Sequence, residues 1–255
     1  MGAYGWKATI GFIGPPRTNE TVLHEAFELA VPGISWCWSV MGLPEFGKFE
    51  FDQALSSAAL CARELAARKV NVIVVGGVPL MTAREPGYHL ELQKQLQAEV
   101  GKDILVTSDL ACYLGAARAY NLRRIALCSL YQRYIQDNVK NHLAHYGFET
   151  VSDVCLDYQL ADCMTKADMD SARIAASQAY REDPSVDGML LFCPQWPVIH
   201  NVPKVEAEMG GKPIIGHMAA VMWGALSQIG VDARQTGYGR LLEDWPAWPG
   251  EVTPR

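Results

Sequence analysis

An internal repeat is the feature of this sequence that most constrains its fold. Three segments recur in the same order roughly 110 to 117 residues later along the chain. "TIGFIGPP" (9–16) matches "RIALCSLY" (124–131), "VNVIVVGGVPL" (70–80) matches "VDGMLLFCPQWPV" (186–198), and "KDILVTSDLACYLGAAR" (102–118) matches "KPIIGHMAAVMWGALSQ" (212–228). Because the order is kept, we expect two similar lobes, each built from one copy of the repeat.

Within each copy, short apolar segments alternate with helix-period stretches. The apolar segments are rich in β-branched residues and are followed by Gly, Pro or Ser, which is typical of strands buried on both faces. They are Thr9–Ile13, Val70–Val75, Ile104–Val106, Ile125–Cys128, Met189–Phe192 and Pro213–Ile215. Helices are predicted over Asp52–Lys69 and Tyr131–Gly147. This alternation predicts an α/β fold, with two pseudo-symmetric lobes that are each a parallel sheet flanked by helices.

The repeat also sets the predicted boundaries. Residues 1–121 form the N-terminal α/β lobe and residues 122–235 the C-terminal α/β lobe. The proline-rich remainder, 236–255, is expected to pack back on the lobes. Ligands of open α/β sheets bind at the carboxyl ends of the strands, so we expect the active site between the two lobes.

Cys193 follows one of these predicted strands directly, and Pro194 and Pro197 come next. The two prolines favour a rigid loop that fixes the direction of the thiol. In the first copy of the repeat, the same position is held by Gly76 and Gly77. The two loops are therefore predicted to face each other across a cleft.

Composition excludes several classes of partner. A net charge of −6 and a pI near 5.5 leave no basic surplus for nucleic acid. The apolar runs are shorter than the roughly 20 residues of a membrane span, and the start lacks the layout of a signal peptide. The seven cysteines include no CxxC pair and are expected to be free thiols in a reducing cytoplasm. No spacing typical of a metal site is present.

Five motifs carry a resemblance to a known family. They are "GFIGPPRTNETVLHEAF", "VVGGVPL", "CSLYQRYIQD", "LLFCPQWP" and "GYGRLL". Because these motifs occur in this order, the sequence resembles the aspartate/glutamate racemase superfamily, specifically its arylmalonate decarboxylase and maleate isomerase branch. The resemblance implies carbon-acid chemistry without a cofactor on a small carboxylic acid, by a monomer or homo-oligomer.

The resemblance also implies which residues act. Racemases of the superfamily use one cysteine on each lobe, whereas arylmalonate decarboxylases resemble this chain in having glycine, here Gly76, at the first position. Cys193 is then the proton donor to an enediolate that forms when CO2 leaves a malonate-type acid. Tyr131 matches a family tyrosine, Pro15 a proline of the decarboxylase pocket, and Asn19 a carboxylate-binding asparagine of maleate isomerases. The amides of Gly77, Val78 and Gln195 are candidate oxyanion donors.

The chain departs from both relatives. Gly77 and Val78 stand where decarboxylases carry hydroxyl residues, and Pro194, which has no amide hydrogen, replaces a glycine. A cofactor-independent decarboxylase is the leading interpretation. A maleate cis–trans isomerase or one-cysteine racemase is the alternative, and a non-catalytic protein that binds small acids is a further one.

Overall fold

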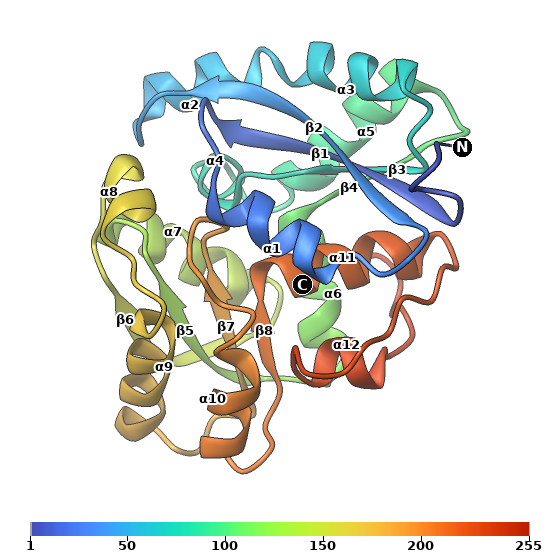
Figure 1. Ribbon diagram of the computed structural model, residues 1–255. Coiled ribbons are helices and arrows are strands. Elements are labelled where there is room, and N and C mark those ends of the chain that lie inside the picture. The colour runs from blue at the N-terminus through green and yellow to red at the C-terminus, as the bar shows by residue number, and fades with distance from the viewer. Residues whose placement is uncertain (1, 255) are drawn as a thin grey trace.

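Two four-stranded parallel sheets form the frame of the protein, which is described over residues 2–254 in a computed structural model (Figure 1). The first sheet has the order β2-β1-β3-β4 and the second the order β6-β5-β7-β8. The strands of the first are β1 (Ala8–Pro16), β2 (Ile34–Leu43), β3 (Val72–Val75) and β4 (Leu105–Ser108). Those of the second are β5 (Arg124–Ser129), β6 (Glu149–Cys155), β7 (Gly188–Phe192) and β8 (Ile214–Gly216). The identical strand order confirms the predicted α/β fold of two pseudo-symmetric lobes.

The six expected strands are all present, but the prediction omitted β2 and β6. Both lie at the edge of their sheet, next to β1 and β5 respectively. Their residues alternate between buried and partly exposed positions, so neither has the continuous apolar run of a central strand.

The helices cover both sheets and connect the strands. The predicted helix over Asp52–Lys69 is two helices, α2 (Lys48–Leu55) and α3 (Ala58–Ala67), which are separated at Ser56 and Ser57. The predicted helix that ends at Gly147 is α7 (Arg133–His145), and Gly147 adopts a φ of 79°, which glycine tolerates best. The helices are α1 (Thr21–Leu29), α2 (Lys48–Leu55), α3 (Ala58–Ala67), α4 (Val78–Thr82), α5 (Tyr88–Val100), α6 (Asp109–Ala119), α7 (Arg133–His145), α8 (Leu160–Thr165), α9 (Ser171–Glu182), α10 (Val202–Glu208), α11 (His217–Gln228) and α12 (Arg240–Asp244).

Helices α6 and α11 join the two lobes. They hold equivalent places, each directly after the fourth strand of its sheet, and they pack against one another between the sheets (Figure 1). Nearly all of their residues are buried. A thiol of Cys112 lies against Gly224, where an added Cβ would stand 2.5 Å from the sulfur. This close, apolar contact fixes the lobes relative to each other.

The C-terminal segment packs on this helix pair. Trp248 covers Gly115 of α6, and its ring centroid lies 5.3 Å from that of Trp223 of α11. The indole N–H of Trp223 donates to the carbonyl of Pro246 at 2.9 Å. Among the described residues, no helix is long and apolar enough to cross a membrane.

Candidate active site

A cavity lies between the lobes at the carboxyl ends of the strands. It holds about 400 Å³ of space between protein atoms, part of it open to solvent. Lobe one contributes the ends of β1 and β2 and the loop after β3, and lobe two contributes the loops after β5 and β7. The lining residues are Phe12, Pro15, Pro16, Leu43, Phe46, Gly77, Pro79, Leu80, Asp109, Tyr131, Leu160, Cys193, Pro194 and Gln195. Cys193 and the Gly77 loop thus face one space, as the repeat predicted.

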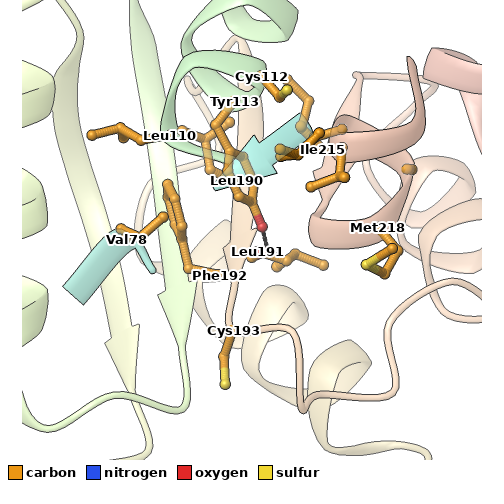
Figure 2. Packing of buried hydrophobic residues seen from close by; sticks show 14 of the residues in the cluster. Val78, Leu110, Cys112, Tyr113, Leu190, Leu191, Phe192, Cys193, Ile215 and Met218 are labelled. Atoms are coloured by element: carbon orange, nitrogen blue, oxygen red, sulfur yellow. Dashed lines mark hydrogen bonds between the residues drawn. The ribbon is translucent and has the colours of Figure 1, made fainter. Parts of the chain in front are cut away.

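Cys193 has an unusual backbone. Its φ is +107°, a conformation that residues with a side chain rarely adopt. Such strain persists where the surrounding structure enforces it, and it is most frequent at functional sites. Figure 2 shows that the sulfur points away from the apolar cluster around Leu190 and Phe192, beyond the end of β7. The side chain is 2% exposed.

Burial keeps the Cys193 thiol neutral. Loss of hydration raises its pKa well above the ordinary value, the neighbouring thiol of Cys163 raises it further, and the backbone N–H of Gln195 lowers it by hydrogen bonding to the sulfur. At neutral pH the group is therefore an S–H that can give a proton. Cys163, on α8, was not expected at the site, and no signal in the sequence pointed to it.

The loop that carries Cys193 is held by a carboxyl group of the other lobe. One oxygen of Glu25, on α1, accepts from the backbone N–H groups of Val198 and of Ile199, the latter at 3.1 Å. The other oxygen is buried without a partner. Burial raises the pKa of Glu25 to about 7, against the lowering effect of the two amides. Sequence reasoning missed this residue because the contact joins positions 173 residues apart.

The β7 strand end is held from lobe one as well. The hydroxyl of Tyr113, on α6, donates to the carbonyl of Leu191, and its ring lies 4.0 Å from that of Phe192 between centroids (Figure 2). The ring also contacts His217 of α11 at 5.7 Å. Burial lowers the pKa of His217 to about 3, so its imidazole is neutral.

The opposing loop of lobe one is built around glycine. Gly77 has a φ of +121°, and an added Cβ would stand 3.0 Å from the ring of Pro15. At Gly76 an added Cβ would stand 2.7 Å from Cζ of Phe12. The Phe12 ring, which lines the cavity, therefore occupies the space that a side chain at position 76 would need.

A second buried carboxyl group holds this glycine loop. Asp109 is the first residue of α6, directly after Ser108, whose hydroxyl accepts from Ala111 N–H and so caps the helix. One oxygen of Asp109 accepts from Gly77 N–H at 2.7 Å and the other from Leu110 N–H at 2.7 Å. Burial raises the pKa of Asp109 to about 7, and these amides and that of Val78 oppose the rise.

Tyr131 lines the cavity from the loop after β5. Its backbone N–H donates to the hydroxyl of Ser129 at 3.2 Å, and its carbonyl accepts from the thiol of Cys155 at 2.8 Å. Its ring packs edge-on against Phe46 at 5.9 Å between centroids. The pKa of Tyr131 is raised well above its usual value, mainly by burial and then by the nearness of Cys193 and Asp109, so the phenol is a neutral donor beside both groups.

The structure brings together most of the expected site residues. Cys193, Tyr131, Pro15, Gly77 and Gln195 line the cavity. Gly76, Val78 and Asn19 are not among its lining residues.

Three of the expected donors already have partners. The N–H of Gly77 and that of Val78 bind Asp109, and the N–H of Gln195 binds the Cys193 sulfur. Asn19 accepts from the side chain of Gln195 at 3.0 Å and donates to the carbonyl of Pro16 at 3.2 Å, so it links the lobes beside the cavity.

Several lining residues were missed by sequence reasoning, and two of them, Phe12 and Asp109, contact the glycine loop. Asp109 was considered only as a helix cap. A signal was available, because the residues that follow it in α6 are apolar on every face, which predicts that the whole helix start is buried. Phe12 lies within an apolar strand, and nothing in the sequence distinguishes it there. Among the described residues, no cluster of His, Cys, Asp and Glu is arranged to hold a metal ion.

Comparison with known proteins gives consistent results. The family profile described as arylmalonate decarboxylase matches residues 10–242. The maleate isomerase of Pseudomonas putida is 27% identical over 208 residues, which are 80% of this chain and 82% of that protein.

Two solved structures have the same fold. A mutant of arylmalonate decarboxylase in its liganded form is 23% identical, with a TM-score of 0.86 over 93% of this chain and 100% of that one. A mutant of the Nocardia farcinica maleate cis–trans isomerase with a covalently bound succinylcysteine intermediate is 22% identical, with a TM-score of 0.82 over 93% and 98% of the two chains.

Proposed function

Since the chain belongs to the arylmalonate decarboxylase family, we propose that it is a cofactor-independent lyase that decarboxylates a malonate-type acid with an apolar substituent. The observation that carries the proposal is the single cavity-lining thiol, Cys193, opposite a loop whose glycine provides no second one. Decarboxylation needs one proton donor at the carbon that loses CO2, and one neutral thiol is sufficient.

The proposed reaction has two steps. The bond between the central carbon and one carboxylate breaks, CO2 leaves, and the electron pair is delocalised over the remaining carboxylate as an enediolate. The Cys193 S–H then gives its proton to the central carbon, and the thiolate is reprotonated from water. In this proposal Tyr131, which lines the cavity, donates to the enediolate oxygens; one donor of this kind typically contributes about 3 kcal/mol.

The cavity walls support an apolar substituent on the substrate. Aromatic rings and aliphatic side chains make up most of the surface, namely Phe12, Leu43, Phe46, Leu80 and Leu160 together with four prolines, Pro15, Pro16, Pro79 and Pro194. A carboxylate pressed against such a wall loses hydration without gaining a partner, which favours its departure as neutral CO2.

Maleate isomerisation is the second candidate, and the curated relatives named maleate isomerase favour it. In the Nocardia farcinica enzyme a cysteine is bound covalently to a succinyl group. Attack of that kind needs a thiolate, whereas burial and Cys163 keep the Cys193 thiol protonated. This protonation state supports proton donation over nucleophilic attack.

The test is an assay of the purified protein with phenylmalonate and, separately, with maleate. We expect CO2 and phenylacetate from phenylmalonate, both lost in Cys193→Ala. Conversion of maleate to fumarate without CO2 release, followed by proton NMR, would replace the proposal with the isomerase. Turnover of phenylmalonate by Cys193→Ala at the wild-type rate would refute the role of the thiol.

A further inference from the structure

The cavity has very few hydrogen-bond donors that could reach a bound anion. Its polar lining residues are Gly77, Asp109, Tyr131, Cys193 and Gln195, and among the described residues that line it none is Lys, Arg or His. An enediolate concentrates negative charge on two oxygens, and in a site of low dielectric such a charge is costly unless donors reach it. Stabilisation of the enediolate therefore depends on how many donors at the cavity have no acceptor within the protein.

Most of the N–H groups near the cavity already have acceptors. Gly77 N–H donates to Asp109, and Gln195 N–H to the Cys193 sulfur. The side-chain amide of Gln195 donates to Asn19. The phenol of Tyr131 remains for a bound anion, while the Cys193 S–H is required at carbon rather than at oxygen. One further donor is missing.

Asp109 can supply it, but only in its protonated form. As a carboxylate it accepts hydrogen bonds and repels a bound anion; as a carboxylic acid it has one O–H to donate. The group is 1% exposed and lines the same cavity as Tyr131 and Cys193. Tyr131 is close enough to Asp109 and Cys193 for a negative charge on either group to raise the pKa of its phenol. Carboxylic acids kept neutral by an apolar site serve as oxyanion donors in other enzymes.

We propose that Asp109 is a further catalytic residue, which binds the substrate as a neutral carboxylic acid and donates its O–H to the carboxylate that becomes the enediolate. The inference rests on the proposed function for the identity of the anion. If Asp109 binds the substrate only as a neutral acid, then substrate binding depends on the protonation of Asp109. An ionised Asp109 therefore takes up one proton when the anion binds.

Among the described residues that line the cavity, none carries a positive charge that would hold Asp109 ionised. The amides that it accepts from favour the carboxylate, and burial, the larger effect, favours the acid, with a resulting pKa of about 7. The titratable groups near Asp109 are neutral thiols and phenols: Cys112 and Tyr113 of α6, Tyr131 after β5, and Cys193, which lines the same cavity. Burial raises the pKa of each, so all stay uncharged near neutral pH.

Binding of phenylacetate, which resembles the product, tests the proposal. Calorimetric titrations at pH 8 in two buffers of different ionisation enthalpy count the protons taken up. We expect close to one proton per phenylacetate at pH 8 and close to none at pH 5.5. Because only the protonated fraction binds, the Kd should be about tenfold higher at pH 8 than at pH 6.

Two variants show which carboxyl group takes up the proton when phenylacetate binds. Asp109→Asn can still accept from Gly77 N–H, and it should bind phenylacetate with no proton uptake and no dependence on pH. Glu25→Gln removes the other buried carboxyl with a pKa of about 7, which lies outside the cavity lining, and it should keep the uptake of one proton. The wild-type proton count tests the proposal even if Asp109→Asn does not fold.

The outcomes separate the two proposals. CO2 release from phenylmalonate by the wild type without proton uptake on phenylacetate binding would overturn the role of Asp109 and leave the decarboxylase intact. Proton uptake that is lost in Asp109→Asn, without CO2 release, would support the donor and refute the decarboxylase. No binding of phenylacetate at pH 6 would contradict the role of Asp109, and CO2 release from phenylmalonate would still decide the decarboxylase.

Discussion

The two lobes share one topology but end their third strands differently. In lobe two, β7 is followed by Cys193, a residue forced to positive φ, and its loop is held by Glu25 from the other lobe. In lobe one, β3 is followed by Gly76, whose missing side chain is replaced in space by the Phe12 ring, and its loop is held by Asp109 of the same lobe. The two lobes thus share one frame, but only lobe two has a thiol at the end of its third strand, which favours one-sided proton delivery.

The largest effect is expected from removing that thiol. Cys193→Ala should lower kcat/KM for phenylmalonate by about 10² to 10⁴, the usual contribution of a general acid. Circular dichroism should be unchanged because alanine fits the same space. Full activity in the variant would contradict the proposed difference between the lobes, because the reaction would then need no thiol.

Loss of the Tyr131 hydroxyl should come next. Tyr131→Phe removes one donor from the enediolate and should lower kcat by about 10² to 10³, with a smaller change in KM. Steady-state kinetics on phenylmalonate measure both. An increase in KM alone would mean that the phenol only binds the ground state.

Glu25→Gln sharpens the comparison between the two buried carboxyls. The folded-state pKa of Glu25 is raised from 4.5 to about 7, so the folded protein binds the proton more tightly than the unfolded chain does. The contribution of Glu25 to wild-type stability therefore falls as pH rises from about 4.5 to 7, and Glu25→Gln, which resembles the neutral acid, does not share that fall. Relative to wild type, the variant should gain up to about 3 kcal/mol between pH 4.5 and pH 8.

Urea unfolding of both proteins at the two pH values measures this difference. Asp109 titrates equally in both and cancels from the comparison. Equal pH dependence in the two proteins would show that folding does not raise the pKa of the Glu25 carboxyl.

The smallest effect concerns the space beside Gly76. Gly76→Cys places a side chain against Phe12, and overpacking of this kind typically costs about 1–3 kcal/mol. Phe12→Leu should relieve part of it, so the double mutant should be about 1 kcal/mol more stable than the sum of the single changes. Additive free energies of unfolding would mean that the Phe12 ring does not occupy that space.

The frame and the position of the thiol could be predicted from the sequence, because both depend on local patterns. Apolar runs that are followed by Gly, Pro or Ser identify central strands, and the repeat pairs Cys193 with Gly76. The edge strands β2 and β6 were missed because neither has the continuous apolar run by which the central strands were identified.

The network around the thiol could not be predicted, since its members are distant in sequence. Glu25 reaches Val198 across the lobes, and Cys163 contacts Cys193 from a separate helix. Asp109 and Phe12 matter through the cavity that they share, and a cavity is a property of the packed chain. The expected amide donors failed for the same reason: their acceptors become known only when the loops are placed.

The stereochemistry of the product tests one-sided proton delivery most directly. Decarboxylation of 2-methyl-2-phenylmalonate in D2O yields 2-phenylpropanoate with a new stereocentre at the carbon that accepts the proton. If Cys193 alone delivers it, the product is a single enantiomer carrying one deuterium at that carbon. Racemic product from the wild-type protein, at early conversion, would contradict a single thiol on one lobe as the proton donor.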